Sequence, residues 1–140
     1  MSEQMMPANG SFCWNELSTT DDAAALKFYS ELIGWEFKKS AAATACEGSE
    51  APPMVYHEIA VGGRHVGGVF KMGPEFGQIP SHWMAYVAVD DVDAKAARVA
   101  ELGGKVRVPP TDIPNVGRFS VIDDPTGATL ALITLKGAQS

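Results

Sequence analysis

The sequence has few features of an exported or nucleic-acid-binding protein. Only two of its 140 residues are cysteine, which is too few for a disulfide framework, and no CxxC pair is present to hold a structural zinc ion. Positive charge is also scarce, because 11 lysine and arginine residues face 17 aspartate and glutamate residues, giving a net charge of −6. Nucleic-acid binding depends on basic side chains that replace phosphate counterions, so we expect no nucleic-acid partner.

Long apolar runs are absent as well. No stretch approaches the ~18 consecutive apolar residues of a membrane-spanning helix. Met1 to Gly10 has no basic segment followed by an apolar one, as a signal peptide would. We therefore expect a cytoplasmic protein with no membrane partner. Hydrophobic residues make up 46% of the chain, which is enough to form a core in a single domain or in two small modules that share one.

Periodicity and turn residues predict the same order of elements twice. Each half is expected to contain a strand, a helix and three further strands. In the first half these span residues 12–18, 23–32, 35–39, 54–61 and 66–72, and in the second half residues 83–89, 92–102, 105–108, 118–122 and 129–135. Gly62-Gly63 predicts a hairpin turn. Residues 41–53 are small and weakly patterned and predict a loop, and the composition leaves open whether this loop acts as a lid.

The two halves match at a spacing of 70 residues. With that shift Asp21 aligns with Asp91, Leu32 with Leu102 and Gly34 with Gly104. One such unit would expose an apolar sheet face, so we expect two βαβββ modules, at about 11–72 and 82–135 with a linker at 73–81, to pack as a single domain. A helix follows a strand only once in each module, which disfavours a doubly wound parallel sheet. The predicted fold class is α+β, with a cup-shaped, mostly antiparallel eight-stranded sheet and the helices outside.

Short motifs along the chain carry a resemblance to a known family. These are Asp21 to Gly34 with Phe28-Tyr29, Leu32 to Trp35, Asp90 to Ala94, Glu101 to Gly104, and Asp124-Pro125-Thr126-Gly127. Together with the doubled βαβββ order, they resemble the vicinal oxygen chelate superfamily, which includes glyoxalase I, bleomycin-resistance proteins, fosfomycin-resistance enzymes and extradiol dioxygenases. The resemblance covers roughly Ser11 to Leu135. It implies the fold more strongly than any activity, because one fold hosts many functions.

The resemblance also implies where a metal would be held. Enzymes of this family bind a divalent ion with His or Glu side chains from the first and last strands of each half. The matching positions here are Trp14, Met84 and Ala131, and the strand at 66–72 contains no Asp, Glu or His. Since Trp, Met and Ala do not supply the usual ligands, we predict that the metal site is absent and that no other cofactor replaces it.

Strand alternation gives a candidate binding surface instead. It places Trp14 and Glu16 on one face of their strand and Met84 and Tyr86 on the matching face of another, while Ala131 and Ile133 share that side on the last strand. Apolar surfaces with a few polar anchors are typical of small-molecule pockets, although the same side chains could simply fill the core. Arg118 begins a strand and either holds an anionic group of a ligand or stays solvated.

Glu16 is the candidate catalytic residue. A carboxylate in mid-strand needs a partner or a perturbed pKa, so it acts either as a base or cation anchor or in a structural ion pair. His57, His65 and His82 could rebuild a displaced metal site with Glu16, although nothing in their spacing requires it.

These observations leave three hypotheses for function. We favour a metal-free member of the family that binds a small, partly apolar molecule. The alternative is a lyase, isomerase or dioxygenase-type enzyme that uses Glu16 or a displaced metal site. The third is an interaction module. Because proteins of this family commonly pair, the resemblance implies a homodimer, with Trp83, Phe70 and Phe76 as candidate interface aromatics.

Overall fold

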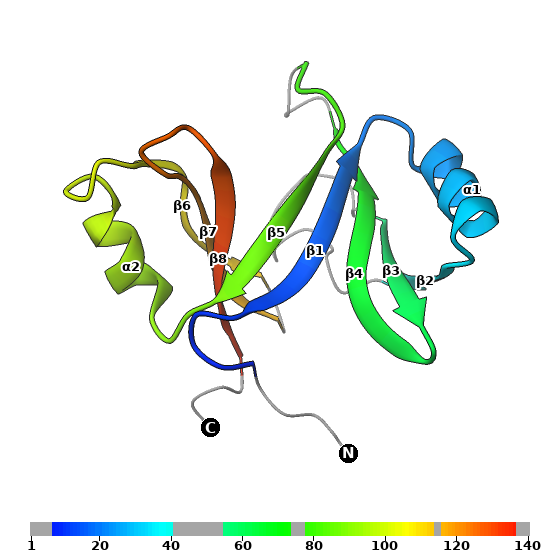
Figure 1. The fold of residues 1–140 in the computed structure, drawn as a ribbon, viewed down its shortest axis with the longest axis horizontal. Coiled ribbons are helices and arrows are strands. Elements are labelled where there is room, and N and C mark those ends of the chain that lie inside the picture. The colour runs from blue at the N-terminus through cyan, green and yellow to red at the C-terminus, as the bar shows by residue number, and fades with distance from the viewer. Residues whose placement is uncertain (1–6, 41–54, 74–77, 114–115, 137–140) are drawn as a thin grey trace, which may run out of the picture. The chain divides into compact units, whose positions relative to one another are not determined.

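The computed structural model describes residues 7–40, 55–73, 78–113 and 116–136. Within them the elements follow the predicted order (Figure 1). They are β1 (Phe12–Thr19), α1 (Asp22–Leu32), β2 (Glu36–Ser40), β3 (Tyr56–Val61), β4 (Arg64–Lys71), β5 (His82–Ala88), α2 (Val92–Val99), β6 (Lys105–Ile113), β7 (Gly117–Asp123) and β8 (Thr129–Leu135). Eight strands and two helices confirm the predicted α+β class. Neither described helix is long and apolar enough to cross a membrane.

The chain divides into two compact units. One comprises Trp14–Met84, and the other comprises Met1–Cys13 together with Ala85–Ser140. The strand order is β2-β3-β4-β1 in the first unit and β5-β8-β7-β6 in the second. The β1–β4 and β5–β8 pairs are parallel, and the remaining pairs within each unit are antiparallel. The mostly antiparallel sheet is therefore confirmed for each unit.

In the first unit, α1 covers one face of the four strands. Leu17, Ile59 and Val69 form the buried core of that face, and Ala25, Leu26 and Tyr29 of α1 are among the side chains packed against it. Leu17 points toward α1. Because successive side chains of a strand point to opposite faces, its neighbour Glu16 lies on the face away from α1.

The helices of the two units begin in the same way. Asp21 and Asp91 are extended N-cap residues whose carboxylates accept hydrogen bonds of 3.1 Å from the backbone N–H groups of Ala24 and Ala94. This matches the 70-residue repeat. The glycine with positive φ that follows each helix does not obey the repeat exactly. In the first unit it is Gly34, with φ at +90°, but in the second it is Gly103, with φ at +93°, one residue before the position that the 70-residue shift predicts.

Two elements end three or more residues away from the sequence-based expectation, while the other boundaries agree within two residues. β6 continues through Pro109 and Pro110, where we expected a loop. It is the edge strand of its unit, and its pairing with β7 shifts register between Val108 and Thr111, so the missing N–H groups of the prolines are tolerated there. α2 ends at Val99, three residues early, and its last turn closes with the Leu102 N–H donating to the Arg98 carbonyl. All of the expected loop at 41–53, and residues 74–77 of the expected linker with Phe76, lie outside the described residues.

Candidate functional site

Trp14 and Glu16 are joined by a side chain that comes from β3. The indole Nε1–H of Trp14 donates a hydrogen bond of 2.8 Å to the Tyr56 hydroxyl oxygen. The Tyr56 hydroxyl in turn donates a hydrogen bond of 2.9 Å to Oε2 of Glu16. We call these three residues the Trp14–Tyr56–Glu16 chain. It lies on the face of the first unit that is opposite α1.

A glycine on the intervening strand makes this arrangement possible. β4 runs between β3 and β1, and Gly68 pairs with Glu16 on one side and with Glu58 on the other. A β-carbon at Gly68 would overlap the ring and hydroxyl of Tyr56. The absence of a side chain at this position therefore lets the Tyr56 ring lie across β4 and reach Glu16.

The environment of Tyr56 keeps its hydroxyl protonated. Tyr56 is 8% exposed, and its burial, followed by the negative charge of Glu16, raises its pKa far above the ordinary value for tyrosine. A protonated phenol remains a hydrogen-bond donor. The hydrogen bond from Tyr56 therefore fixes the orientation of the Glu16 carboxylate.

Apolar side chains surround this polar chain. Phe70 and Met72 are buried beside Tyr56, and Trp14 packs against the same cluster. The rings of Tyr56 and Phe70 are stacked, with centroids 6.5 Å apart. Trp14 and Glu16 themselves are only half-buried, so both retain surface that a small molecule can touch.

Each of the three histidines has a partner of its own that is not part of this chain. Nε2 of His57 lies 3.3 Å from a carboxylate oxygen of Asp22 in α1, so it points to the helix-covered face. His65 is ion-paired with Glu58, and Nδ1 of His82 lies 2.9 Å from the Pro80 carbonyl oxygen. No group of three or more His, Cys, Asp or Glu residues that could hold a metal occurs among the described residues.

The residues at the family's metal positions do not fit a metal ion. The indole of Trp14 offers only an N–H donor, which is already bonded to Tyr56. Ala131 is fully buried and has no donor atom, and Met84 offers only a thioether. Oxygen and nitrogen ligands are what a Lewis-acid ion of this family needs, so we derive no chemistry through a metal.

In the second unit the structure brings together three of the predicted ligand-binding residues. Tyr86 of β5 pairs with Ala131 of β8, and Ile133 follows two residues later on the same face. All three are buried, and the Tyr86 ring lies against Phe119 with centroids 6.5 Å apart. Met84, further back in β5, is half-buried.

Arg118 is turned away from that group. It neighbours Phe119 in β7, and Phe119 shares the face of Ile133, so alternation directs Arg118 to the face on which α2 packs. There its guanidinium makes two hydrogen bonds to Asp93, of 2.9 and 3.1 Å, and one of 3.1 Å to Asp112. These carboxylates raise the pKa of Arg118 further above its ordinary value. The Arg118 guanidinium is therefore bonded to Asp93 and Asp112 and does not lie beside Tyr86, where a ligand-binding role would place it.

Sequence reasoning missed Tyr56 and Gly68. Both lie in strands that it identified, and the paired glycines Gly67-Gly68 already indicated a strand without side chains on part of its length. The cross-strand register was needed to show that this gap is filled by Tyr56 and that it leads to Glu16.

Comparison with known proteins identifies the class of this one. The model of the Glyoxalase/Bleomycin resistance protein/Dioxygenase superfamily matches residues 13–132. This covers most of the chain, and the protein belongs to that family. The resemblance noted from the sequence is thereby confirmed.

The curated relatives of this chain carry names of two different kinds. The chain is 39% identical over 124 residues to the Mycobacterium tuberculosis protein named "Putative glyoxylase CFP32", covering 89% of this chain and 44% of that protein. It is 33% identical over 137 residues to the Streptomyces peucetius anthracycline biosynthesis protein DnrV, covering 89% and 47% respectively. The chain thus spans about half the length of these curated relatives.

Solved structures share the fold. The Mycobacterium tuberculosis methylmalonyl-CoA epimerase superposes with a TM-score of 0.59 at 14% identity, covering 96% of this chain and 95% of the epimerase. A Streptomyces coelicolor methylmalonyl-CoA epimerase gives 0.60 at 16% identity, covering 93% and 100%. At such identities the likeness concerns the fold alone.

Proposed function

We propose that this protein binds a small, partly apolar molecule, without a resident metal, against the Trp14–Tyr56–Glu16 chain. The observation that carries the proposal is the pair of hydrogen bonds from Trp14 to Tyr56 and from Tyr56 to Glu16. They orient the Glu16 carboxylate beside the half-buried indole of Trp14, next to the apolar side chains of Phe70 and Met72. An apolar surface with a few oriented polar groups is how small-molecule sites are usually built.

The names of two relatives support an aromatic ligand. DnrV and the Streptomyces protein DauV, which is 32% identical over 137 residues, are both anthracycline biosynthesis proteins. Anthracyclines combine flat fused rings with hydroxyl groups and an amine. Trp14 supplies a ring face for stacking, and Glu16 supplies an acceptor for a hydroxyl or ammonium donor. We therefore propose a flat aromatic molecule with hydrogen-bond donors as the ligand class.

Titration with a fluorescent anthracycline tests this proposal. We expect saturable binding to the wild-type protein, followed by the change in anthracycline fluorescence and by an increase in Tm. Trp14→Ala and Glu16→Gln should each weaken binding about tenfold or more, because the first removes the ring face for stacking and the second removes the carboxylate. Elemental analysis of the same purified protein should find less than about a tenth of an equivalent of any metal.

The control variant is Asn15→Ala, since Asn15 lies between the two tested residues but is exposed on the other face of β1. It should bind as the wild type does. Absence of saturable binding by the wild-type protein, or equal weakening by Asn15→Ala, would contradict the proposal.

A second candidate is an enzyme in which the Glu16 carboxylate takes up a proton. The oriented carboxylate favours this candidate, and so does the name of the mycobacterial relative. The hydrogen bond from Tyr56 opposes it, because it occupies a carboxylate oxygen that would otherwise be free to take up the proton. The two candidates separate in an assay of thioester formation from a 2-oxoaldehyde and glutathione. Turnover that is lost in Glu16→Gln, with the fold retained, would favour the enzyme.

A further inference from the structure

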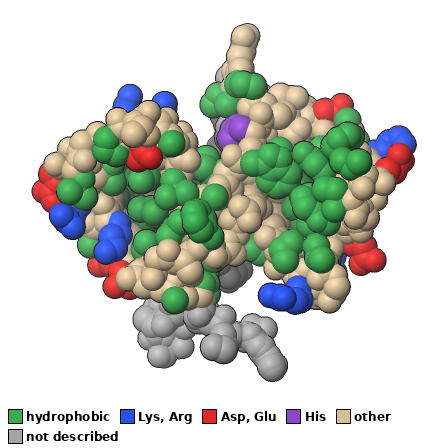
Figure 2. Space-filling model, viewed as in Figure 1, with side chains coloured by type: hydrophobic (Ala, Val, Ile, Leu, Met, Phe, Trp, Pro, Cys, Tyr) green, Lys and Arg blue, Asp and Glu red, His purple; other side chains and the backbone are tan. Residues whose placement is uncertain are grey.

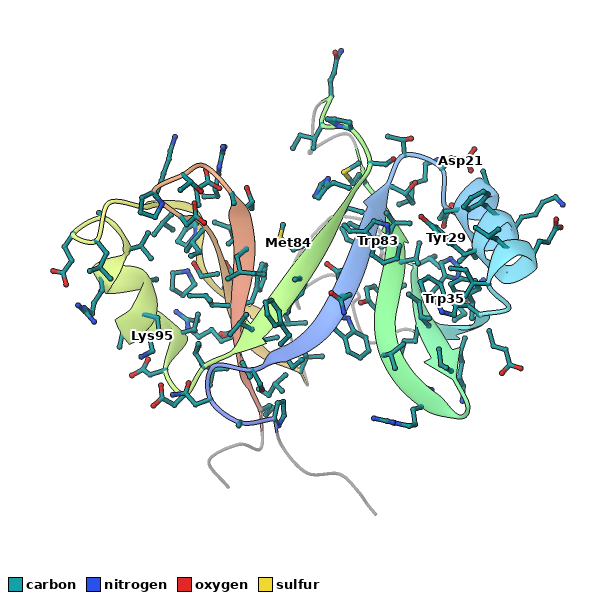
Figure 3. The ribbon with its side chains drawn as sticks, in the orientation of Figure 1. Asp21, Tyr29, Trp35, Trp83, Met84 and Lys95 are labelled. Atoms are coloured by element: carbon teal, nitrogen blue, oxygen red, sulfur yellow. The ribbon has the colours of Figure 1, made fainter. Side chains whose placement is uncertain are left out.

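The two faces of the first unit carry different side chains. α1 packs on one face, where the ring centroid of Tyr29 lies 5.3 Å from that of Trp35 and 5.7 Å from that of Trp83. Figure 3 shows these three rings grouped beside α1, and Figure 2 shows hydrophobic side chains gathered over this unit. The other face carries the proposed binding site. Side chains on that second face are the ones that a bound molecule would meet.

Ser18 lies on the face of the proposed site. In the parallel pairing of β1 with β4, Leu17 is opposite Val69 and Ser18 is opposite Phe70. Leu17 and Val69 belong to the core that packs against α1, whereas Phe70 belongs to the apolar cluster of the proposed site. Since successive side chains alternate, Ser18 shares the face of Glu16 and lies roughly 7 Å from it along the strand.

The Ser18 hydroxyl is buried without a hydrogen-bond partner. Ser18 is 5% exposed, and within the described parts of the chain its hydroxyl forms no hydrogen bond. The other buried serine and threonine side chains in those parts are bonded. Ser120 donates a hydrogen bond of 2.6 Å to the Val108 carbonyl, and Thr19 accepts one of 3.3 Å from the Ser81 hydroxyl. A buried hydroxyl without a partner lowers stability, so its retention points to a group that reaches it from outside the chain.

We propose that Ser18 is a second polar anchor of the binding site and that it selects ligands with a carbonyl group. The inference rests on the proposed function, since it concerns the same ligand. The Glu16 carboxylate offers an acceptor, whereas a serine hydroxyl can also donate. A buried hydroxyl that only accepted would leave its own proton unbonded, so an acceptor on the ligand is the better partner.

The burial of Ser18 also limits the shape of the group that reaches it. Its small exposed fraction admits a single atom rather than a ring, and a carbonyl oxygen at the edge of a ring system meets this condition. The ligand class is therefore a flat aromatic ketone or quinone. Its hydrogen-bond donor for Glu16 would lie on the order of 7 Å from the carbonyl oxygen, as the spacing along β1 requires.

Calorimetric titration with a matched pair of probes tests this proposal. Aminomethylanthraquinone and aminomethylanthracene share the ring outline and the ammonium group and differ in the ring carbonyls. We expect the wild type to bind the quinone about tenfold more tightly, because only the quinone gives the Ser18 hydroxyl an acceptor. Ser18→Ala should remove this preference, whereas Glu16→Gln should weaken both probes alike. Anthracyclines carry the same ring carbonyls, so Ser18→Ala should weaken their binding as well.

Thermal unfolding without ligand distinguishes a hydroxyl kept for a ligand from a structural one. Ser18→Ala should leave Tm unchanged or raise it, since it removes a buried group that has no partner among the described residues. The matched control is Ser120→Ala, which should lower Tm by about 3 °C or more because it breaks the hydrogen bond to the Val108 carbonyl. This control should bind both probes as the wild type does.

Equal affinity of the wild type for the two probes would overturn this role for Ser18 and leave the proposed function intact. A preference that survives in Ser18→Ala, or an anthracycline affinity that Ser18→Ala leaves unchanged, would do the same. A lower Tm in Ser18→Ala would also overturn it, because the hydroxyl would then have a structural partner. If the wild type binds neither the probes nor the anthracycline, the proposed function fails and this inference fails with it.

Discussion

Gly68 lies beneath the ring of Tyr56, and a β-carbon at this position would overlap the ring and hydroxyl. Gly68→Ala should therefore force Tyr56 out of its buried site and break both hydrogen bonds of the Trp14–Tyr56–Glu16 chain. We expect a loss of about 1–3 kcal/mol in the free energy of unfolding, which is typical of overpacking, together with loss of ligand binding. Urea denaturation measures the first effect and anthracycline titration the second.

A double-mutant cycle separates this mechanism from a general effect on β4. In the Tyr56→Ala background the ring is gone, so Gly68→Ala should cost much less than in the wild type. If the two substitutions are additive instead, the space at Gly68 is not what positions Tyr56.

The turn between β7 and β8 shows how an element boundary depends on one carboxylate. Asp124 accepts hydrogen bonds from the Thr126 hydroxyl (2.6 Å) and from the backbone N–H groups of Thr126 (2.8 Å) and Ala128 (3.1 Å). Together they hold the pKa of Asp124 below its ordinary value, and the Thr126 hydroxyl has the largest effect.

A lowered pKa means that the folded state favours the ionised form. The stability contributed by Asp124 is therefore present above its unfolded pKa of about 3.9 and is lost as the pH falls through the lower, folded value. Asp124→Asn should be less stable than the wild type at pH 7, and the difference should shrink below about pH 4. Urea denaturation at pH 7, 5 and 3 measures this, with the exposed Asp90→Asn as a control. A difference that stays constant down to pH 3 would contradict this role for Asp124.

The order of elements could be predicted from the sequence because its signals are local. A cap such as Asp21 or Asp91 bonds a backbone group three residues away, and a turn such as Gly62-Gly63 needs only its own positive φ angles. The continuation of β6 through Pro109 could not be predicted in this way, because it depends on β6 lying at an edge.

The candidate site was predictable only in part, for the same reason. Alternation along β1 was enough to place Trp14 and Glu16 on one face. Their connection through Tyr56 spans residues 42 and 40 positions apart and depends on the register of three strands. The partners of Arg118 likewise come from other elements, and Asp93 lies 25 positions away. Long-range register is set by the packing of the whole unit, which a local pattern does not contain.

At the scale of the whole molecule, the chain passes from one compact unit to the other within β1, after Cys13. The segment before that point belongs to the unit that contains α2. The N–H of Gly10 donates to the Ala88 carbonyl (2.6 Å), the N–H of Ala88 donates to the Ser11 carbonyl (2.8 Å), and the Asn9 side chain accepts from the N–H of Asp90 (3.0 Å). Gly10 makes this turn with φ at +93° and with open space where a β-carbon would be.

Gly10→Ala should therefore act through backbone strain alone, at a cost of roughly 1–2 kcal/mol. Because the segment bonds to residues near the end of β5, the cost should fall on the unit that contains α2. Native-state hydrogen exchange should show faster exchange at Ala88 and Asp90, and little change at Val69 in the core of the other unit. Gly10→Asn should have a smaller effect, since asparagine tolerates positive φ better than alanine does. Equal loss of protection at Ala88 and Val69 would mean that the two compact units unfold as one, and that the division of the chain is geometric rather than energetic.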